Sequence, residues 1–301
     1  MESVVSDYDV CDIKGMRVNN TGKGEVMNLK NHIICSGIRL LLVAGASCLL
    51  LQNANATLIF SEPFNEPVGP LSGAVNNDAV AWSGGNSGLN IVSGDLTYPG
   101  LVDQGGNELQ IVNATAGSSV NTFANQTSGP IYYSFLFDPT VVDSGNQYFT
   151  AMNPSSGGPN GGSDAIDAYS YSSGKIEVRA NAQSASAGTG PALTLGTTYL
   201  VVEEIDLTGL TASLWIDPAS STFGGTAPTA TASISPTTAT AVDDVGFKAE
   251  GGTGSYLVDN LLIGTTWADV TPAAVVPEPS TFALAGAGFG IMFMMIRRRR
   301  S

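Results

Sequence analysis

Between residues 57 and 272 the chain consists of short apolar segments that alternate with polar residues and are separated by turn-forming residues. In residues 175–179 the apolar Ile176 and Val178 alternate with charged side chains. Because successive side chains of a β-strand point to opposite faces, this pattern predicts a strand that buries one face and exposes its charges. Comparable segments predict further strands at residues 57–60, 108–112, 131–137, 147–151, 199–202, 212–216, 245–249 and 256–263.

Gly, Asn, Ser and Pro punctuate these segments, and no stretch of ten residues has the periodicity of an amphipathic helix. About ten strands at this spacing favour an all-β domain. Residues 199–202 form a more continuous apolar run, which is typical of a central strand. We therefore predict an antiparallel two-sheet jelly-roll sandwich.

The predicted domain is strongly acidic. Between residues 57 and 280 there are only three basic side chains, Lys175, Arg179 and Lys248, against 21 Asp and Glu residues. Such a domain is a poor partner for nucleic acid, whose phosphates must be neutralised by Lys and Arg. It is equally unsuited to an anionic lipid surface. Cations and neutral glycans are compatible with this charge.

Every cysteine and the only histidine precede residue 57: Cys11, Cys35, Cys48 and His32. The domain from residue 57 to 272 therefore lacks the side chains for disulfides, thiolate nucleophiles and Ser-His-Asp relays. It also lacks the His and Cys ligands of zinc and haem sites. No such cofactor is expected.

An export signal is predicted at residues 27–56. Lys30 and Arg39 precede an apolar run at residues 40–51, and Ala54 and Ala56 supply the small residues that a signal peptidase accepts. Cleavage is expected between Ala56 and Thr57. A lipoprotein signal at Cys48 and an uncleaved anchor are alternatives, but the apolar run is short for a membrane span of about 20 residues.

Residues 1–26 do not fit this signal, because they carry the acidic residues Glu2, Asp7, Asp9, Asp12 and Glu25. We interpret them as a non-native N-terminal extension, with translation starting at Met27.

The C-terminal tail combines three elements. A Pro-rich linker at residues 273–280 contains Pro277-Glu278-Pro279, and residues 281–296 form an uncharged apolar run. Residues 281–301 are therefore predicted as a transmembrane helix with a cytoplasmic end. The basic cluster is an orientation stop that keeps the chain end inside the cell and the domain outside; it consists of Arg297, Arg298, Arg299 and Arg300.

These three elements, in this order over residues 276–301, resemble the PEP-CTERM sorting signal of bacterial proteins that exosortases process. The resemblance implies that a membrane-embedded enzyme recognises the chain at or near Pro277, Glu278 and Pro279. Removal of the tail and delivery to the cell surface would follow. A permanent tail anchor with a Pro-rich stalk is the alternative.

Residues 197–202, 213–218 and 258–270 resemble the concanavalin A-like (laminin-G-like) domains found upstream of such tails. The resemblance covers residues 195–272 well and residues 57–194 only in general character. It implies a jelly roll whose first and last strands pair, so that residues 57–60 lie beside residues 258–263.

Two groups of acidic residues are candidates for chemistry. Glu204 and Asp206 would share one face of a strand and could serve as the paired carboxylates of a glycosidase. The alternative is a solvated hairpin end, because a turn at Leu207-Thr208-Gly209 follows. Asp243-Asp244 together with Asp259-Asn260 could offer oxygen ligands to Ca²⁺.

The tryptophans Trp82, Trp215 and Trp267 are the candidates for stacking on sugar rings. Trp82 is the possible glycan contact, whereas Trp215 lies between apolar neighbours, which indicates a core residue. The sequence thus predicts an exported, non-catalytic surface or extracellular-matrix protein, with exopolysaccharide as a candidate ligand. Its precursor is expected to be anchored in the inner membrane. A secreted carbohydrate-active enzyme with paired carboxylates is the alternative.

Overall fold

The computed structural model describes residues 58–76, 79–85, 87–154, 159, 164–170, 173–180, 188–235, 237–274 and 298. The chain divides into two units, Met1–Ala54 and Asn55–Ser301. The predicted extension, signal peptide and cleavage site lie outside the described residues, as does the tail except for Arg298. Among the residues described, no helix is long and apolar enough to cross a membrane.

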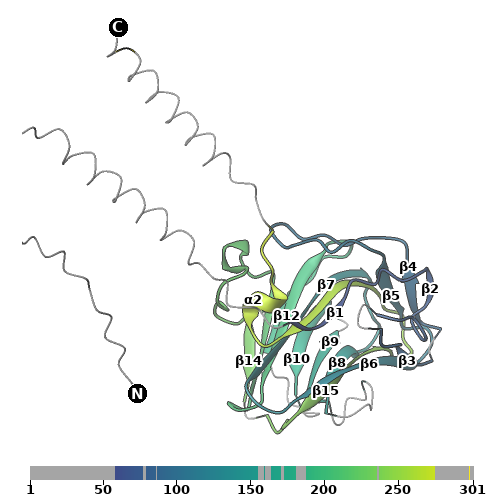
Figure 1. The fold of residues 1–301 in the computed structure, drawn as a ribbon. Coiled ribbons are helices and arrows are strands. Elements are labelled where there is room, and N and C mark those ends of the chain that lie inside the picture. Colours follow the sequence, from purple (N-terminus) through teal and green to yellow (C-terminus); the bar gives the residue numbers. More distant parts are fainter. Residues whose placement is uncertain are drawn as a thin grey trace, which may run out of the picture. The chain divides into compact units, whose positions relative to one another are not determined.

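The domain is an all-β sandwich of two antiparallel sheets (Figure 1), which confirms the predicted fold class. The first sheet has nine strands, in the order β14 (Ala232–Ile234), β13 (Thr211–Ile216), β12 (Tyr199–Asp206), β7 (Pro130–Val141), β16 (Ser255–Gly264), β5 (Glu108–Val112), β4 (Leu89–Val92) and β2 (Gly69–Pro70), while β1 (Leu58–Glu62) pairs with β16. The second has seven, in the order β11 (Gly188–Ala192), β10 (Lys175–Arg179), β9 (Ile166–Ser170), β8 (Gln147–Asn153), β15 (Val242–Ala249), β6 (Gly117–Gln126) and β3 (Ser83–Gly84).

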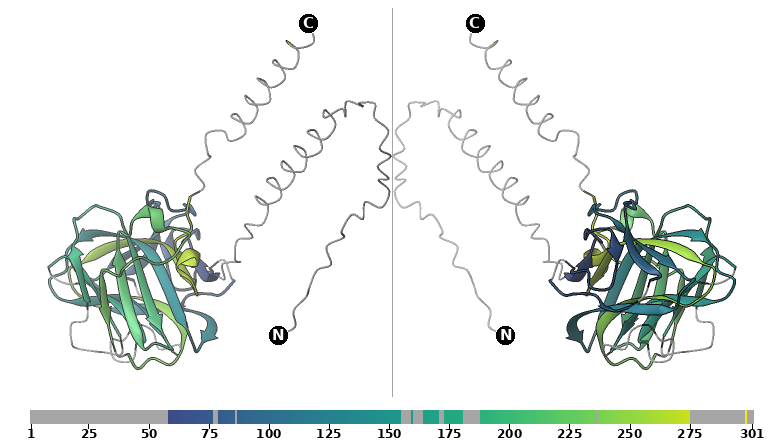
Figure 2. Two further views of the ribbon diagram at one scale, coloured as in Figure 1. Left: turned by 90° about the vertical axis from the view of Figure 1, so that its left-hand side faces the viewer. Right: turned by 90° about the vertical axis from the view of Figure 1, so that its right-hand side faces the viewer.

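The first and last strands pair, as the resemblance implied. In β1, Phe60 lies opposite Ile263, and Glu62 lies opposite Leu261. The other half of β16 pairs with β5, and an irregularity between the two halves coincides with Asn260, whose φ is 51°. Both ends of the described domain therefore lie on one side of the sandwich, where dark-blue β1 and the yellow end appear together in Figure 2.

Two apolar clusters hold the sheets in place. The larger cluster fills the space between the sheets with residues such as Phe135, Phe149 and Val245. The smaller one covers the outer face of the nine-stranded sheet and includes Leu200 and Trp215. Because β12 contributes Val201 to the first cluster and Leu200 to the second, it is buried on both faces, as its continuous apolar run predicted.

The short elements near the C-terminal end are a 3-10 helix, η1 (Ser220–Thr222), and the one-turn helix α2 (Trp267–Val270). A capping box starts α2, in which Thr266 accepts from the Asp269 amide and the Asp269 side chain accepts from the Thr266 amide. The Trp267 indole donates to the Thr222 carbonyl at 3.0 Å. These contacts attach η1 and α2 to each other.

One sequence expectation needs correction in β10. Ile176 and Val178 lie in the inter-sheet core as predicted, but Glu177 does not point into solvent: it is 1% exposed. Its carboxylate lies 3.5 Å from the Arg179 guanidinium, on the opposite face of the strand from the core. The alternation therefore identified the two faces correctly, whereas further chain covers the face expected to be exposed.

Candidate functional site

The last described residues before the tail are held firmly against the domain. Ala273 forms a β-bridge with Leu101. The Ala274 amide donates to the Gly100 carbonyl at 2.9 Å. The Val102 amide donates to the Pro272 carbonyl, also at 2.9 Å. Backbone pairing therefore holds the domain's last described residues up to Ala274, which is three positions before the predicted sorting strip at Pro277 in the sequence.

The acidic cluster of β12 is divided between three environments. Glu203 is fully buried between the sheets, where the Tyr133 hydroxyl donates to it at 2.5 Å. Burial, opposed by that hydrogen bond, raises the pKa of Glu203 well above its ordinary range. Asp206 accepts hydrogen bonds from the Thr208 and Gly209 amides and so caps the hairpin turn.

Glu204 lies on the same side as Asp206, as the sequence predicted, and is half-buried. Burial raises its pKa; hydrogen bonding to Tyr132 opposes this, and the charge of Asp206 adds to it. With Asp206 engaged in the turn, this pair has the form of a hairpin end rather than two unengaged carboxylates facing a substrate.

The proposed calcium ligands do not form one site. Asp243 and Asp244 lie on β15 in the seven-stranded sheet, whereas Asp259 and Asn260 lie on β16 in the other. Asp259 is fully buried and accepts from the Leu96 and Asn260 amides at 2.9 and 2.7 Å. Within the described part of the chain, no three acidic, His or Cys side chains are arranged to hold a metal ion.

Trp82 is a core residue and offers no free ring face to a sugar. It is 1% exposed and packs against Phe64 and Phe247, with ring centroids 6.5 and 5.6 Å away. Its indole N–H donates to the buried Glu62 carboxylate at 2.8 Å. Burial raises the pKa of Glu62 to about 7. The commoner role of a buried tryptophan therefore applies here, and the proposed glycan contact at Trp82 is wrong.

Sequence reasoning missed the carboxylates that the fold places near Asp259, which are associated with β5 and β7. Burial, and then the nearby charges of Asp138 and Asp95, raise the pKa of Glu108, which is 7% exposed. Burial likewise raises the pKa of Asp259 to about 8, and the charges of Asp95 and Glu108 add to this effect. These residues are scattered along the chain, so only the pairing of their strands brings them together.

A small pocket opens between the two sheets at one end of the sandwich. The pocket wall is mainly apolar and includes Val142, Leu193 and Leu195, with Lys175 as its positive charge. Leu195 is 48% exposed, so it stands at the mouth.

The polar floor of this pocket comes from distant parts of the chain. The Tyr256 hydroxyl lies 2.6 Å from the Ser170 hydroxyl and donates to the Asp143 carboxylate at 3.4 Å. Asp143, which is 4% exposed, also accepts from the Asn113 side-chain amide at 2.5 Å and from the Thr253 backbone amide at 3.2 Å. Its position is therefore set by two distant segments of the chain, at Asn113 and at residues 253–256.

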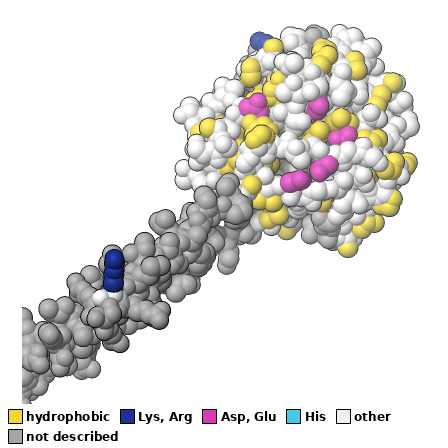
Figure 3. All heavy atoms as spheres, turned by 90° about the horizontal axis from the view of Figure 1, so that it is seen from above, with side chains coloured by type: hydrophobic (Ala, Val, Ile, Leu, Met, Phe, Trp, Pro, Cys, Tyr) yellow, Lys and Arg dark blue, Asp and Glu magenta, His cyan; other side chains and the backbone are white. Residues whose placement is uncertain are grey.

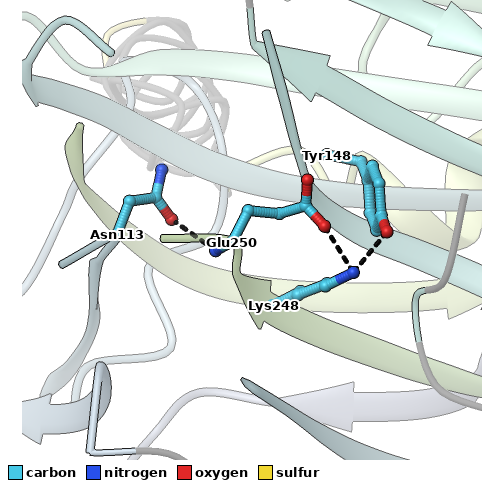
Figure 4. A network of polar contacts seen from close by, with 4 residues as sticks. All are labelled: Asn113, Tyr148, Lys248 and Glu250. Atoms are coloured by element: carbon cyan, nitrogen blue, oxygen red, sulfur yellow. Dashed lines mark hydrogen bonds and ion pairs between the residues drawn. The ribbon is translucent and has the colours of Figure 1, made fainter. Parts of the chain in front are cut away.

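Asn113, which holds the floor through Asp143, is itself part of the polar network drawn in Figure 4. Asn113 accepts from the Glu250 amide at 3.1 Å, and the Glu250 carboxylate pairs with Lys248. Lys248 also hydrogen-bonds to the Tyr148 hydroxyl and lies 3.9 Å from the centre of that ring. Hydrogen bonds within the protein thus fix the positions of the hydroxyl groups and the carboxylate in the floor.

Comparisons with known proteins bear on the tail and on the fold. Residues 275–300 match the PEP-CTERM protein-sorting motif. This confirms the resemblance predicted from the tail, and the motif implies export, exosortase processing and sorting to the cell surface. The motif begins at the residue after Ala274, whose amide is hydrogen-bonded to the Gly100 carbonyl. No curated protein matches the chain in sequence.

Several solved structures resemble the sandwich in fold alone. A carbohydrate esterase from the Shiga toxin-encoding bacteriophage phi24B is 15% identical, with a TM-score of 0.42 over 69% of this chain and 98% of that one. A Trypanosoma rangeli sialidase is 10% identical (TM-score 0.42, 80% of this chain, 37% of that one). The binding domain of botulinum neurotoxin DC is 7% identical (TM-score 0.44, 72% and 49%). None of these similarities bears on what this chain binds.

Proposed function

We propose that this chain is an exported, non-catalytic protein of the bacterial cell surface or extracellular matrix, which binds a glycan across the mouth of the small pocket at the end of its sandwich. Signal peptidase would remove residues up to Ala56. The apolar segment at 281–296 would hold the precursor in the inner membrane, with Arg297 to Arg300 on the cytoplasmic side. An exosortase-type enzyme would then process the chain at Pro277-Glu278-Pro279. The sorting motif over residues 275–300 is the observation that carries this proposal.

The sorting part of the proposal has a direct test. Replacing Pro277-Glu278-Pro279 by Gly-Ser residues should abolish tail removal, measured as the mass of the mature chain by intact-protein mass spectrometry. Retained processing would leave a plain tail anchor as the better explanation. A peptide that spans residues 23–30 in the precursor would show that translation starts upstream of Met27.

A binding role is supported by how the carboxylates are engaged. Asp206 and Asp259 accept backbone hydrogen bonds, and Glu203 is sealed in the core. The mouth of the end pocket instead presents apolar side chains such as Leu195 above the hydroxyl groups of Ser170 and Tyr256, which suits contact with the mixed polar and apolar surface of a glycan. The domain's acidity favours a neutral saccharide over a strongly anionic polymer.

The pocket can be tested on a glycan array with a variant that blocks its mouth. Leu195→Glu should abolish binding without unfolding the protein, because this side chain is 48% exposed. The matched control is Val68→Glu, which changes a side chain that is 61% exposed and does not line the pocket. Equal binding by both variants would remove the pocket from the proposal.

A secreted carbohydrate-active enzyme is the second candidate, and the carboxylates around Glu108 favour it. Raised pKa values near neutrality are characteristic of catalytic acids, and the pKa values of Glu108 and Asp259 both lie above the ordinary range. A panel of glycoside substrates would test this with two variants, Glu108→Gln and Glu204→Gln. Turnover by the native chain that either variant loses would favour the enzyme. Binding without turnover would favour the binding protein.

A further inference from the structure

The sorting motif begins immediately after a rigid exit from the domain. We call residues 271–274 the exit segment and residues 98–103 and 220–226 the exit loops. Hydrogen bonds between backbone groups join them on both sides: Gly224 donates to Thr271 at 2.7 Å, Val102 to Pro272 at 2.9 Å, and Ala274 to Gly100 at 2.9 Å. The exit segment is therefore fixed between the two exit loops, next to the tail it leads into.

The distance available to a processing enzyme follows from the sequence. Three residue steps separate Ala274 from Pro277. A fully extended chain advances at most about 3.6 Å per residue, so Pro277 lies no more than about 11 Å from the exit segment. A cleft that binds an extended peptide holds several residues on each side of the reacting bond. An enzyme that binds the strip at Pro277 must therefore approach the exit loops.

The exit loops cannot easily move aside to make room. Leu101 and Phe223 are 6% and 7% exposed and belong to the apolar cluster on the outer face of the nine-stranded sheet. Trp267 lies in the same cluster and holds the Thr222 carbonyl through its indole N–H. Displacing either loop would expose these side chains to water, which is unfavourable. The enzyme thus meets a preformed surface.

The charge of this surface indicates the class of its partner. Residues 93–107, 217–230 and 264–274 contain no Lys or Arg, whereas Asp103 and Asp217 are exposed there. Seen from above, the domain shows acidic side chains among neutral and hydrophobic ones (Figure 3). Anionic lipid headgroups attract clusters of Lys and Arg, so this surface is unsuited to lying on them. A protein partner fits better.

We propose that the exit loops form a docking surface for the exosortase-type processing enzyme, which contacts the folded domain while it binds the tail. The contact surface on the enzyme is neutral or basic, to complement Asp103 and Asp217. This inference rests on the proposed processing of the tail. It adds that the enzyme reads the folded domain as well as the sorting motif.

The test compares two substitutions in the full-length chain, expressed in a bacterium that supplies the processing enzyme. Val102→Arg places a bulky cation on an exit loop, where the side chain is 37% exposed. Val141→Arg is the matched control, because it changes a side chain that is 45% exposed but lies away from the exit segment. Val141 is the last residue of β7, whereas the part of β7 near the exit segment is at Ser134, whose hydroxyl donates to the Val270 carbonyl. Tail removal is followed over time by the mass of the chain.

Each variant is also made with a flexible spacer of 12 Gly and Ser residues after Ala274, a length that spans roughly 20 Å on average. Without the spacer, Val102→Arg should slow processing roughly tenfold relative to native, as the loss of one interface anchor does, while Val141→Arg should not. With the spacer, Val102→Arg and its parent should be processed at equal rates, because the domain no longer has to dock.

Three results would overturn the docking proposal: Val102→Arg processed at the native rate, the same deficit with and without the spacer, or faster processing of Val102→Arg, which would indicate attraction to lipid. Failure of the proposed processing itself looks different. In that case the native chain keeps its tail, or loses it even when Pro277-Glu278-Pro279 is replaced.

Discussion

Asp167, on β9, carries a charge that the fold disfavours. Its side chain is 1% exposed, and its Oδ1 atom has no hydrogen-bond partner among the described residues. Burial, and then the nearby charge of Asp164, raise the pKa of Asp167 to about 7, although Arg179 opposes this rise. We therefore expect Asp167→Asn to stabilise the domain at alkaline pH, because it keeps the shape of the side chain and removes the charge.

The magnitude follows from this pKa. A tenfold change in the proton-binding equilibrium corresponds to about 1.4 kcal/mol, so a pKa that rises from 3.8 to about 7 makes ionised Asp167 cost about 4 kcal/mol in the folded protein. Because the folded pKa is the higher one, the native domain does not pay this cost below about pH 4, where Asp167 is protonated in both the folded and the unfolded chain. The cost appears as the pH rises above about 4 and is complete once the pH exceeds about 7. At pH 8 the variant should be more stable than the native domain by about 4 kcal/mol, and near pH 4 the two should be alike.

Urea unfolding of residues 57–274, followed by tryptophan fluorescence at intervals from pH 4 to pH 8, measures this difference. The matched control is Asp143→Asn, also a buried carboxylate, but one with hydrogen-bond donors on both oxygens. Its amide nitrogen would face one of those donors, so this variant should be less stable than native by about 1–3 kcal/mol at pH 8. If Asp167→Asn is no more stable than native at pH 8, or if its advantage is independent of pH, the reasoning is wrong.

Three further predictions concern packing, capping and burial. A methyl group at Gly254 would lie 2.5 Å from the buried Asp143 carboxylate in the pocket floor. Gly254→Ala should therefore lower the free energy of unfolding, measured in urea, by about 1–3 kcal/mol. Gly85→Ala is the control and should lower it much less, because the space around Gly85 is open. Thr266→Ala removes the cap of α2 and should lower the free energy of unfolding by about 1 kcal/mol; an unchanged value would show that the apolar contacts alone hold this turn. Tyr133→Phe removes the hydroxyl donor of buried Glu203 and should lower thermal stability by about 1–3 kcal/mol at pH 8, and unchanged melting would contradict the assigned hydrogen bond.

Several strands were not predicted from the sequence, and buried polar residues explain why. In β6, Ser119 and Asn121 are buried, so the apolar alternation expected of a strand is interrupted. In β9, the buried Asp167 has the same effect. Alternation counts apolar side chains, whereas these strands also bury polar ones.

By itself, the sequence determined the class of the fold and the address of the protein. Alternation within five or six residues is a local property, and it predicted β10 and β13, while the continuous apolar run at residues 199–202 predicted β12. The sorting tail is also local, since its three elements are contiguous in the sequence, and the family motif over residues 275–300 matches it.

Only the tertiary structure decided where chemistry and recognition can take place. The pocket floor joins Asp143, Ser170 and Tyr256, and the exit segment joins residues 100–102 to residues 272–274. These partners are separated by 27 to 174 positions in the chain, so no sequence pattern connects them. Strand pairing brings them together, and the burial that it creates turns Trp82 from a candidate sugar contact into a core residue. It also converts acidic side chains that would ionise freely in water into buried groups whose charge costs stability.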